Sequence, residues 1–129
     1  KDVCPSLKNC IITSEILDQS DRDLLQTTLD LKVINEYGAS EVGLIAIENS
    51  NNILELCEET VFVEIFENKI NRDHPNSGKI LVTSLHNKAM PFIRYNIGDL
   101  GSINNSQLGG TFKRSFKQLY GRDGPPKHN

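Results

Sequence analysis

The segment "SDRDLLQTTLDLKVINEYGASEVG", residues 20–43, decides the fold because a helical pattern and a strand pattern meet in it. Its leucines first recur at helical spacing, which predicts a helix over about 20–30. Ser20 with Asp23 three positions later resembles a capping box, so we expect the helix to begin at this serine. The apolar run that follows changes to the pattern of a buried strand.

Two short apolar runs flank the predicted helix. They are "LKNCII" at 7–12 and "LKVIN" at 31–35, so a strand, a helix and a second strand follow one another within about 30 residues, as in a βαβ unit. Such units form parallel sheets, and ligands of open parallel sheets gather beyond the carboxyl ends of the strands. The polar stretch "EYGASE" at 36–41 lies at that end. We therefore expect a ligand site there.

The rest of the chain has the patterns of an antiparallel β structure. Short strand candidates lie at 42–48, 53–57, 60–67 and 78–85. The last two are separated by the polar stretch "NKINRDHPNSG", which predicts a hairpin. The fold class is therefore α/β plus β, the end of a parallel α/β subdomain followed by an antiparallel, barrel-like β subdomain. The expected divisions are 1–50 for the α/β end, 51–116 for the β region and 117–129 for the start of a hinge.

The composition excludes several classes of protein. With 129 residues, 37% hydrophobic and 24% charged, the chain is predicted to be a soluble globular protein, and its start at Lys1 suggests a fragment. A net charge of −3 gives no electrostatic case for nucleic acid, and no apolar run approaches the roughly 18 residues of a membrane span. Cys4, Cys10 and Cys57 match neither an even disulfide set nor a metal motif, so reduced thiols in a cytoplasmic protein are expected.

The first candidate site consists of Tyr37, Gly38, Ser40 and Glu41. A glycine allows close approach of the backbone to a ligand, a tyrosine offers a flat face to a base, and a carboxylate can hold magnesium. Together these groups suit a nucleotide, although a tyrosine-glycine turn with a nearby acid is also common at strand ends.

The second candidate site is "NKAMPFIRYNIGDLG", residues 87–101. Asp99 follows a glycine and can accept hydrogen bonds from two hydroxyls at once, as a ribose presents them. The structural alternative is a β-bulge capped by this aspartate, with Arg94 as its salt-bridge partner. A third stretch, "YGRDG" at 120–124, places Arg122 in a glycine turn and has little specificity alone.

The order and spacing of these motifs resemble those of a known family. A strand ending in YGxSE, then a β region, then MPxIRYxxGD, then GR resembles the adenylate-forming enzymes, the AMP-producing acyl- and aryl-CoA ligase superfamily. More narrowly, "SEILDQSDRDLL", "VINEYGASEVG" and "TSLHNKAMPFIRYNIGDLG" are similar to its phenylacetate–CoA ligase and CapK capsular-polysaccharide branch. The resemblance covers the chain from about Ile11 to Arg122.

The resemblance implies a site for ATP or AMP, with magnesium, a small-molecule carboxylate substrate and coenzyme A as acceptor. By this resemblance Tyr37, beside Gly38, stacks on the adenine, and Asp99 and Arg122 bind the ribose. Ser40 contacts the α-phosphate, and Glu41 ligates magnesium. The turn at Ser14 and Glu15 lines the adenine and acyl pocket. Ser40 and Glu41 are thus the implied catalytic residues. Ser14 departs from the pattern, since glycine or alanine is usual before the acid.

The motifs are compatible with three functions. The first is a carboxylate-activating ligase that transfers an acyl group to coenzyme A. The second is a CapK-like adenylating enzyme of polysaccharide biosynthesis whose acceptor is a sugar, an amine or a deazaflavin, and the third is a non-catalytic nucleotide-binding module. The family's upstream phosphate loop and its downstream lysine-bearing domain have no counterpart in this sequence, so the 129-residue piece is expected to be inactive alone. Gly124 stands where the family's hinge usually has an acid, which is a departure from the family pattern, and the sequence sets no oligomeric state.

Overall fold

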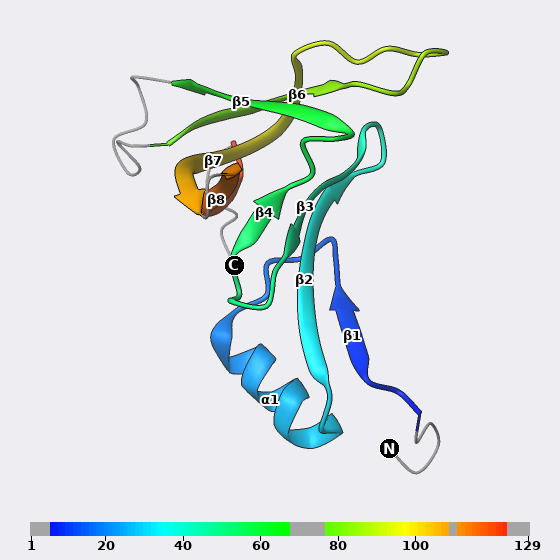
Figure 1. Ribbon diagram of the computed structural model, residues 1–129, viewed down its shortest axis with the longest axis vertical. Coiled ribbons are helices and arrows are strands. Elements are labelled where there is room, and N and C mark those ends of the chain that lie inside the picture. The colour runs from blue at the N-terminus through cyan, green and yellow to red at the C-terminus, as the bar shows by residue number, and fades with distance from the viewer. Residues whose placement is uncertain (1–5, 68–76, 109–110, 124–129) are drawn as a thin grey trace.

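The computed structural model describes residues 6–67, 77–108 and 111–123. In this part of the chain one helix lies beside an eight-stranded mixed sheet, whose strand order is β1-β2-β3-β4-β8-β7-β6-β5 (Figure 1). The elements are β1 (Asn9–Ile12), α1 (Gln19–Leu29), β2 (Lys32–Ala39), β3 (Gly43–Glu48), β4 (Leu54–Leu56), β5 (Val61–Glu67), β6 (Gly78–Ser84), β7 (Tyr95–Leu108) and β8 (Thr111–Arg122).

The predicted βαβ unit is present. β1 pairs in parallel with β2, from Asn9 beside Lys32 to Ile12 beside Asn35, and α1 connects the two strands. The other strand pairs of the sheet are antiparallel. The structure thus confirms the α/β plus β fold class, and the predicted hairpin is the β5–β6 pair. No helix in the described ranges has both the length and the apolar character needed to cross a membrane.

The start of α1 differs from the predicted capping box. The N-cap is Asp18, whose carboxylate accepts hydrogen bonds from the backbone N–H of Asp21 at 2.9 Å and from the Ser20 hydroxyl at 2.7 Å. These bonds hold the pKa of Asp18 below its ordinary value. A carboxylate satisfies the free N–H groups of the first turn and also interacts favourably with the helix dipole, which a serine hydroxyl does not. The helix therefore begins one residue earlier than Ser20.

The tyrosine-glycine pair also lies differently from the prediction. We expected a strand ending at residue 35, with Tyr37 and Gly38 in the turn beyond it. Instead β2 continues to Ala39, because its second half leaves β1 and pairs antiparallel with β3, with a bulge between Tyr37 and Gly38. The partner strand satisfies the backbone groups that would otherwise end the strand. Of the predicted site residues, only Ser40 and Glu41 lie in the turn after β2.

The antiparallel strands curl around a single core, as the barrel-like prediction requires. Figure 1 shows β5 and β6 crossing over the end of the β2–β3–β4 layer, with β7 and β8 at its side. The ten buried residues of the core come from β3 to β8 and the turn before β3, namely Val42, Ile45, Ala46, Leu56, Val61, Val63, Ile80, Val82, Ile97 and Phe116. Because these strands all contribute to one cluster, β2 and β7, which are far apart in strand order, approach each other.

The β7–β8 ribbon carries the second and third motifs. Asp99 on β7 is the register partner of Arg122 on β8, so two motifs 23 residues apart lie side by side. β8 runs without interruption across residue 116, the expected boundary of the β region, and that division stays a prediction. Residues 117–122 of the expected hinge belong to β8, and residues 124–129, with Gly124 among them, lie outside the described residues.

Candidate functional site

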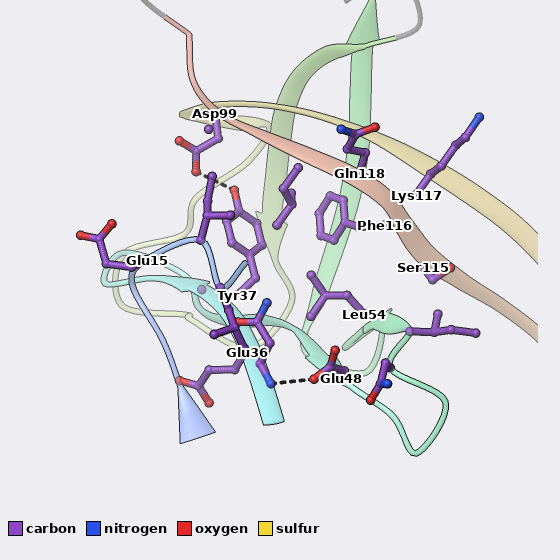
Figure 2. A pocket seen from close by; sticks show the side chains of 18 of the residues that line it. Glu15, Glu36, Tyr37, Glu48, Leu54, Asp99, Ser115, Phe116, Lys117 and Gln118 are labelled. Carbon is purple, nitrogen blue, oxygen red and sulfur yellow. Dashed lines mark hydrogen bonds between the residues drawn. The ribbon is translucent and has the colours of Figure 1, made fainter. Parts of the chain in front are cut away.

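A cavity of about 1140 Å³ opens between β2, the loop before α1 and the β7–β8 ribbon. Six of the eight predicted site residues line it, and they come from all the motifs: Ser14, Glu15, Tyr37, Gly38, Asp99 and Arg122. Figure 2 shows Glu15, Tyr37 and Asp99 around this space, with Phe116 and Leu54 forming an apolar side. The fold thus gathers residues that lie up to 108 positions apart in the sequence.

Tyr37, Asp99 and Arg122 form a connected polar group in this cavity. The Tyr37 hydroxyl donates to Asp99 Oδ2 at 2.7 Å, and Arg122 Nε lies 3.4 Å from Asp99 Oδ1. Arg122 Nη1 also donates to the Ile97 carbonyl at 2.8 Å. The Asp99 side chain is 20% exposed, so it is held from both sides yet still open to a ligand.

Gly98 gives Arg122 the room to reach Ile97 and Asp99. The backbone of Gly98 has φ +85, in the left-handed region, and an added Cβ would lie 3.0 Å from Arg122 Nη1. The backbone N–H of Asp123 donates to the Gly98 carbonyl at 2.8 Å, which closes the end of the ribbon. Glycine adopts this backbone conformation without strain, and a Cβ at this position would crowd the adjacent guanidinium group.

The aromatic ring of Tyr37 is packed as well as hydrogen-bonded. It meets Phe116 edge to face, with ring centroids 5.3 Å apart. Burial, together with the hydrogen bond to Asp99, raises the pKa of Tyr37 far above its ordinary value. The hydroxyl is therefore a hydrogen-bond donor at any physiological pH. Phe116 was missed in the sequence because its pattern is that of an ordinary core residue.

Ser40 and Glu41 line a neighbouring cavity of about 460 Å³, together with His86 and Lys88. Glu41 accepts a hydrogen bond from the Tyr95 hydroxyl at 2.9 Å. Bonds from its own backbone N–H and from Tyr95 hold the pKa of Glu41 below its ordinary value, and the charge of Arg122 acts in the same direction. The structure thus separates the two implied catalytic residues from the larger cavity, while Arg122 lies close enough to influence both sites.

Arg94 has a different partner from the one considered in the sequence. Its Nε lies 3.1 Å from Glu64 Oε2, and its backbone N–H donates to Thr83 Oγ1 at 3.0 Å. Asp99 is paired with Arg122 instead. Strand pairing places Arg122 on β8 opposite Asp99, and β5 lies only one strand beyond β6, the neighbour of β7. Neither approach is visible in the spacing of the motif.

Ser14, in the turn before α1, has a backbone conformation that favours glycine. Its φ is 74, in the left-handed region that glycine adopts without strain. We expect Ser14→Gly to raise the free energy of unfolding by about 0.5–1 kcal/mol, because the relief of strain exceeds the added chain entropy of glycine. Chemical denaturation of the full-length protein measures this, with Ser14→Ala as the control that removes the hydroxyl but keeps Cβ. A glycine variant no more stable than the alanine variant would contradict the prediction.

A buried ion pair forms another part of the cavity wall, and sequence reasoning missed it. Arg22 on α1 is 8% exposed, and its Nη2 lies 2.7 Å and 2.9 Å from the two carboxylate oxygens of Glu48 on β3. Arg22 Nη1 donates to the Val33 carbonyl, and Glu48 accepts from the backbone N–H of Asn35. The pair joins α1, β2 and β3, so it holds the helix against the sheet.

The basic stretch "FKRSFKQ" at 112–118 is largely neutralised within the fold. Lys113 lies 3.0 Å from Glu55, and Arg114 lies 2.7 Å from Glu58. Arg114 also donates to the Val63 carbonyl and stacks over Phe62. These contacts give Lys113 and Arg114 structural roles.

Comparisons with known sequences and structures gave contrasting results. No protein-family model matches the chain, and no curated protein matches it. Two crystal structures of 2-hydroxyisobutyryl-CoA ligase are similar. The open conformation, in complex with 2-HIB-AMP and CoA, has a TM-score of 0.72 at 20% identity over 89% of this chain. The postadenylation state, in complex with R3-HIB-AMP, has a TM-score of 0.64 at 20% identity over 80% of this chain.

The ligase chains in these two crystal structures are much longer than this sequence. The chain covers 29% of the first ligase chain and 23% of the second. The identity is low, so the likeness concerns the backbone and its topology. The fold of this chain is therefore that of a segment of 2-hydroxyisobutyryl-CoA ligase.

Proposed function

We propose that this chain is the AMP-binding part of an adenylate-forming ligase. The full-length protein would join a carboxylate to the AMP moiety of ATP, release pyrophosphate, and pass the acyl group to coenzyme A. The observation that carries the proposal is the convergence of residues from all the motifs on one cavity, with Tyr37 hydrogen-bonded to Asp99. The likeness of fold also supports the proposal, because both similar crystal structures contain an AMP conjugate and one of them also contains CoA.

The larger cavity suits the nucleoside. Tyr37 and Phe116 supply aromatic surface for a base, and Asp99 supplies acceptors for the ribose hydroxyls. Arg122, whose side chain is 76% exposed, supplies positive charge at the opening. Fixing base and ribose in this way would place the α-phosphate toward the turn that bears Ser40 and Glu41, where the geometry of attack is set.

The smaller cavity suits the phosphates. The substrate's carboxylate oxygen attacks the α-phosphorus, a P–O bond forms, and the bond to the pyrophosphate oxygen breaks. Ser40 would donate a hydrogen bond to an α-phosphate oxygen, and Lys88 and Arg122 would offset negative charge. In this scheme no side chain forms a covalent bond with the substrate.

Glu41 fits a magnesium ion held mainly by substrate. The described residues contain no group of three His, Cys, Asp or Glu side chains that could hold a metal by themselves. Magnesium is commonly bound by one or two carboxylates plus substrate phosphates, and Glu41 is exposed and ionised at neutral pH. Bound there, the ion would neutralise phosphate oxygens as charge moves to pyrophosphate.

The narrower proposal is the phenylacetate–CoA ligase and CapK branch, which rests on the motif resemblance alone. A cytoplasmic location is proposed with it, since Cys10 and Cys57 are both free thiols. Coenzyme A as acceptor is favoured over a sugar, an amine or a deazaflavin because one of the similar structures holds CoA.

Carboxylate-dependent ATP–pyrophosphate exchange by the full-length protein tests the proposal. We expect exchange with at least one member of a panel of aryl and short acyl acids, including phenylacetate. Adding coenzyme A, a sugar phosphate, an amine or a deazaflavin in turn then identifies the acceptor by product formation. Binding of ATP without exchange for any acid would overturn ligase activity and leave a nucleotide-binding module.

A further inference from the structure

Two tyrosine–carboxylate hydrogen bonds connect the two motifs crosswise. Tyr37, from the first motif, donates to Asp99 of the second at 2.7 Å, as the dashed line in Figure 2 shows. Tyr95, from the second motif, donates to Glu41 of the first at 2.9 Å. β2 and β7 are separated in the sheet by β3, β4 and β8, so both bonds span the curl of the sheet and not a pair of neighbouring strands.

We propose that the hydroxyls of Tyr37 and Tyr95 are positioning groups that orient Asp99 toward a ribose and Glu41 toward metal-bound phosphate. This inference rests on the proposed function and extends it, since the family resemblance assigns Tyr37 only its ring and gives Tyr95 no role. The first motif thereby contributes the carboxylate of Glu41 and the hydroxyl that orients Asp99. The second contributes the carboxylate of Asp99 and the hydroxyl that orients Glu41. We call the two bonds, formed by Tyr37, Asp99, Tyr95 and Glu41, the crossed pairs.

The contacts of Asp99 leave acceptor sites where a diol needs them. A carboxylate has two oxygens with about four acceptor positions in all. Tyr37 occupies a position on Oδ2, and Arg122 faces Oδ1. One position on each oxygen remains for the two hydroxyls of a ribose. Rotation of a carboxylate about its last torsion is only weakly restricted, so the Tyr37 hydroxyl fixes an orientation that the torsion itself does not.

Glu41 needs an external partner even more than Asp99 does. Its side chain is long and exposed, so it would sample many rotamers without a partner. Tyr95 engages Oε1 at 2.9 Å, and the backbone N–H of Glu41 also donates to this carboxylate. The Tyr95 ring is itself fixed against Phe92, with ring centroids 4.9 Å apart. The phenol therefore provides an anchored donor for a mobile carboxylate.

The protonation states keep both hydrogen bonds intact near neutral pH. Burial and Asp99 raise the pKa of Tyr37, and the bond to Glu41 raises the pKa of Tyr95. The pKa of Glu41 is lowered, so its carboxylate stays ionised. Each phenol therefore remains a donor, and Glu41 remains an acceptor.

The first test compares nucleotide binding by the full-length wild-type protein, Tyr37→Phe and Tyr95→Phe. AMP and 2′,3′-dideoxy-AMP are titrated calorimetrically. We expect Tyr37→Phe to weaken AMP binding about 5- to 10-fold, and to reduce the preference for AMP over the dideoxy analogue by the same factor. Tyr95→Phe is the matched control and should keep the wild-type preference within about twofold. Retention of the full preference by Tyr37→Phe would overturn the role of its hydroxyl.

The second test measures the magnesium concentration needed for half-maximal ATP binding. Tyr95→Phe is expected to raise it about 5- to 10-fold, and Tyr37→Phe to leave it unchanged, because each hydroxyl acts on a different carboxylate. Phenylalanine keeps the ring contacts of both positions, so each variant should fold. An equal loss in both variants and both assays would indicate general loosening and would overturn separate positioning roles.

A measurement without nucleotide separates failure of this inference from failure of the proposed function. In protein with isotope-labelled tyrosine, NMR follows the ionisation of Tyr95 with pH. Glu41→Gln should lower the pKa of Tyr95, because the negative charge that helps to raise it is removed, and Asp99→Asn should not. If Glu41→Gln produces this shift but the wild-type protein does not bind AMP, the crossed pairs exist, and both the nucleotide site and the positioning role are refuted. AMP binding without the shift would refute the crossed pairs alone.

Discussion

Glu41→Gln in the full-length protein is expected to lower carboxylate-dependent ATP–pyrophosphate exchange by about 100-fold or more. Glutamine has nearly the same shape and can still accept the hydrogen bond from Tyr95, so the change removes mainly the negative charge. That charge is what would hold magnesium against the phosphates while two anions, the substrate carboxylate and ATP, are brought together. The initial rate of exchange at saturating ATP and acid measures the effect.

The matched control is Glu59→Gln. Glu59 is also exposed and carries the same charge, but it lies in the turn before β5 and lines neither cavity. Exchange by this variant should stay close to wild type. If Glu41→Gln retained exchange within about threefold of wild type, its carboxylate would not be the metal ligand, and the proposed arrangement of the phosphates would have to be abandoned.

Arg22→Ala is expected to reduce the free energy of unfolding by about 3–5 kcal/mol, a large part of the 5–15 kcal/mol that stabilises a typical domain. The side chains of Arg22 and Glu48 are 9% and 8% exposed, so removal of the arginine leaves a carboxylate buried without its cation. Glu48→Ala should cost a similar amount, because a buried guanidinium then loses both of its carboxylate contacts. Denaturant titration of the full-length protein, followed by circular dichroism, measures both changes.

A second ion pair provides the control for burial. Arg94 and Glu64 lie 3.1 Å apart, but their side chains are 55% and 32% exposed. Exposed pairs contribute little, so Arg94→Ala should change stability by about 1 kcal/mol or less. The double replacement Arg22→Met with Glu48→Leu should recover most of the loss, since a buried ion pair can be replaced by apolar groups. Equal effects of Arg22→Ala and Arg94→Ala would refute a special contribution of the buried pair.

The two predictions concern different properties of the same region. Arg22 and Glu48 form part of the wall of the larger cavity but hold α1 against β2 and β3, so their loss should appear first as reduced stability. Glu41 is exposed and belongs to the smaller cavity, so its loss should appear as reduced rate with little change in stability. Both the free energy of unfolding and the exchange rate should be measured for the Arg22, Glu48 and Glu41 variants. The comparison distinguishes residues that stabilise the fold around the cavity from a residue that takes part in the reaction.

The sequence by itself determined α1, the approximate positions of strands β1 to β6 and the residue types of the candidate site. Leucines at helical spacing predicted α1, flanking apolar runs predicted β1 and β2, and a polar turn between two apolar runs predicted the β5–β6 hairpin. These features depend on backbone preferences and on side chains a few positions apart, so they can be read locally. The motifs also named six residues that line one cavity.

Only the tertiary structure decided which groups contact one another. Asp18 and Ser20 both have side chains that can cap the helix, and residue spacing alone did not show that Asp18 is the N-cap. The other deciding contacts join distant positions: Arg22 with Glu48 over 26 residues, Tyr95 with Glu41 over 54, and Tyr37 with Asp99 over 62. Such partners depend on how the sheet curls, because the curl places β2 beside β7 although three strands separate them in the sheet. The curl follows from burying the side chains of β3 to β8 in one core, a collective effect that no single motif encodes.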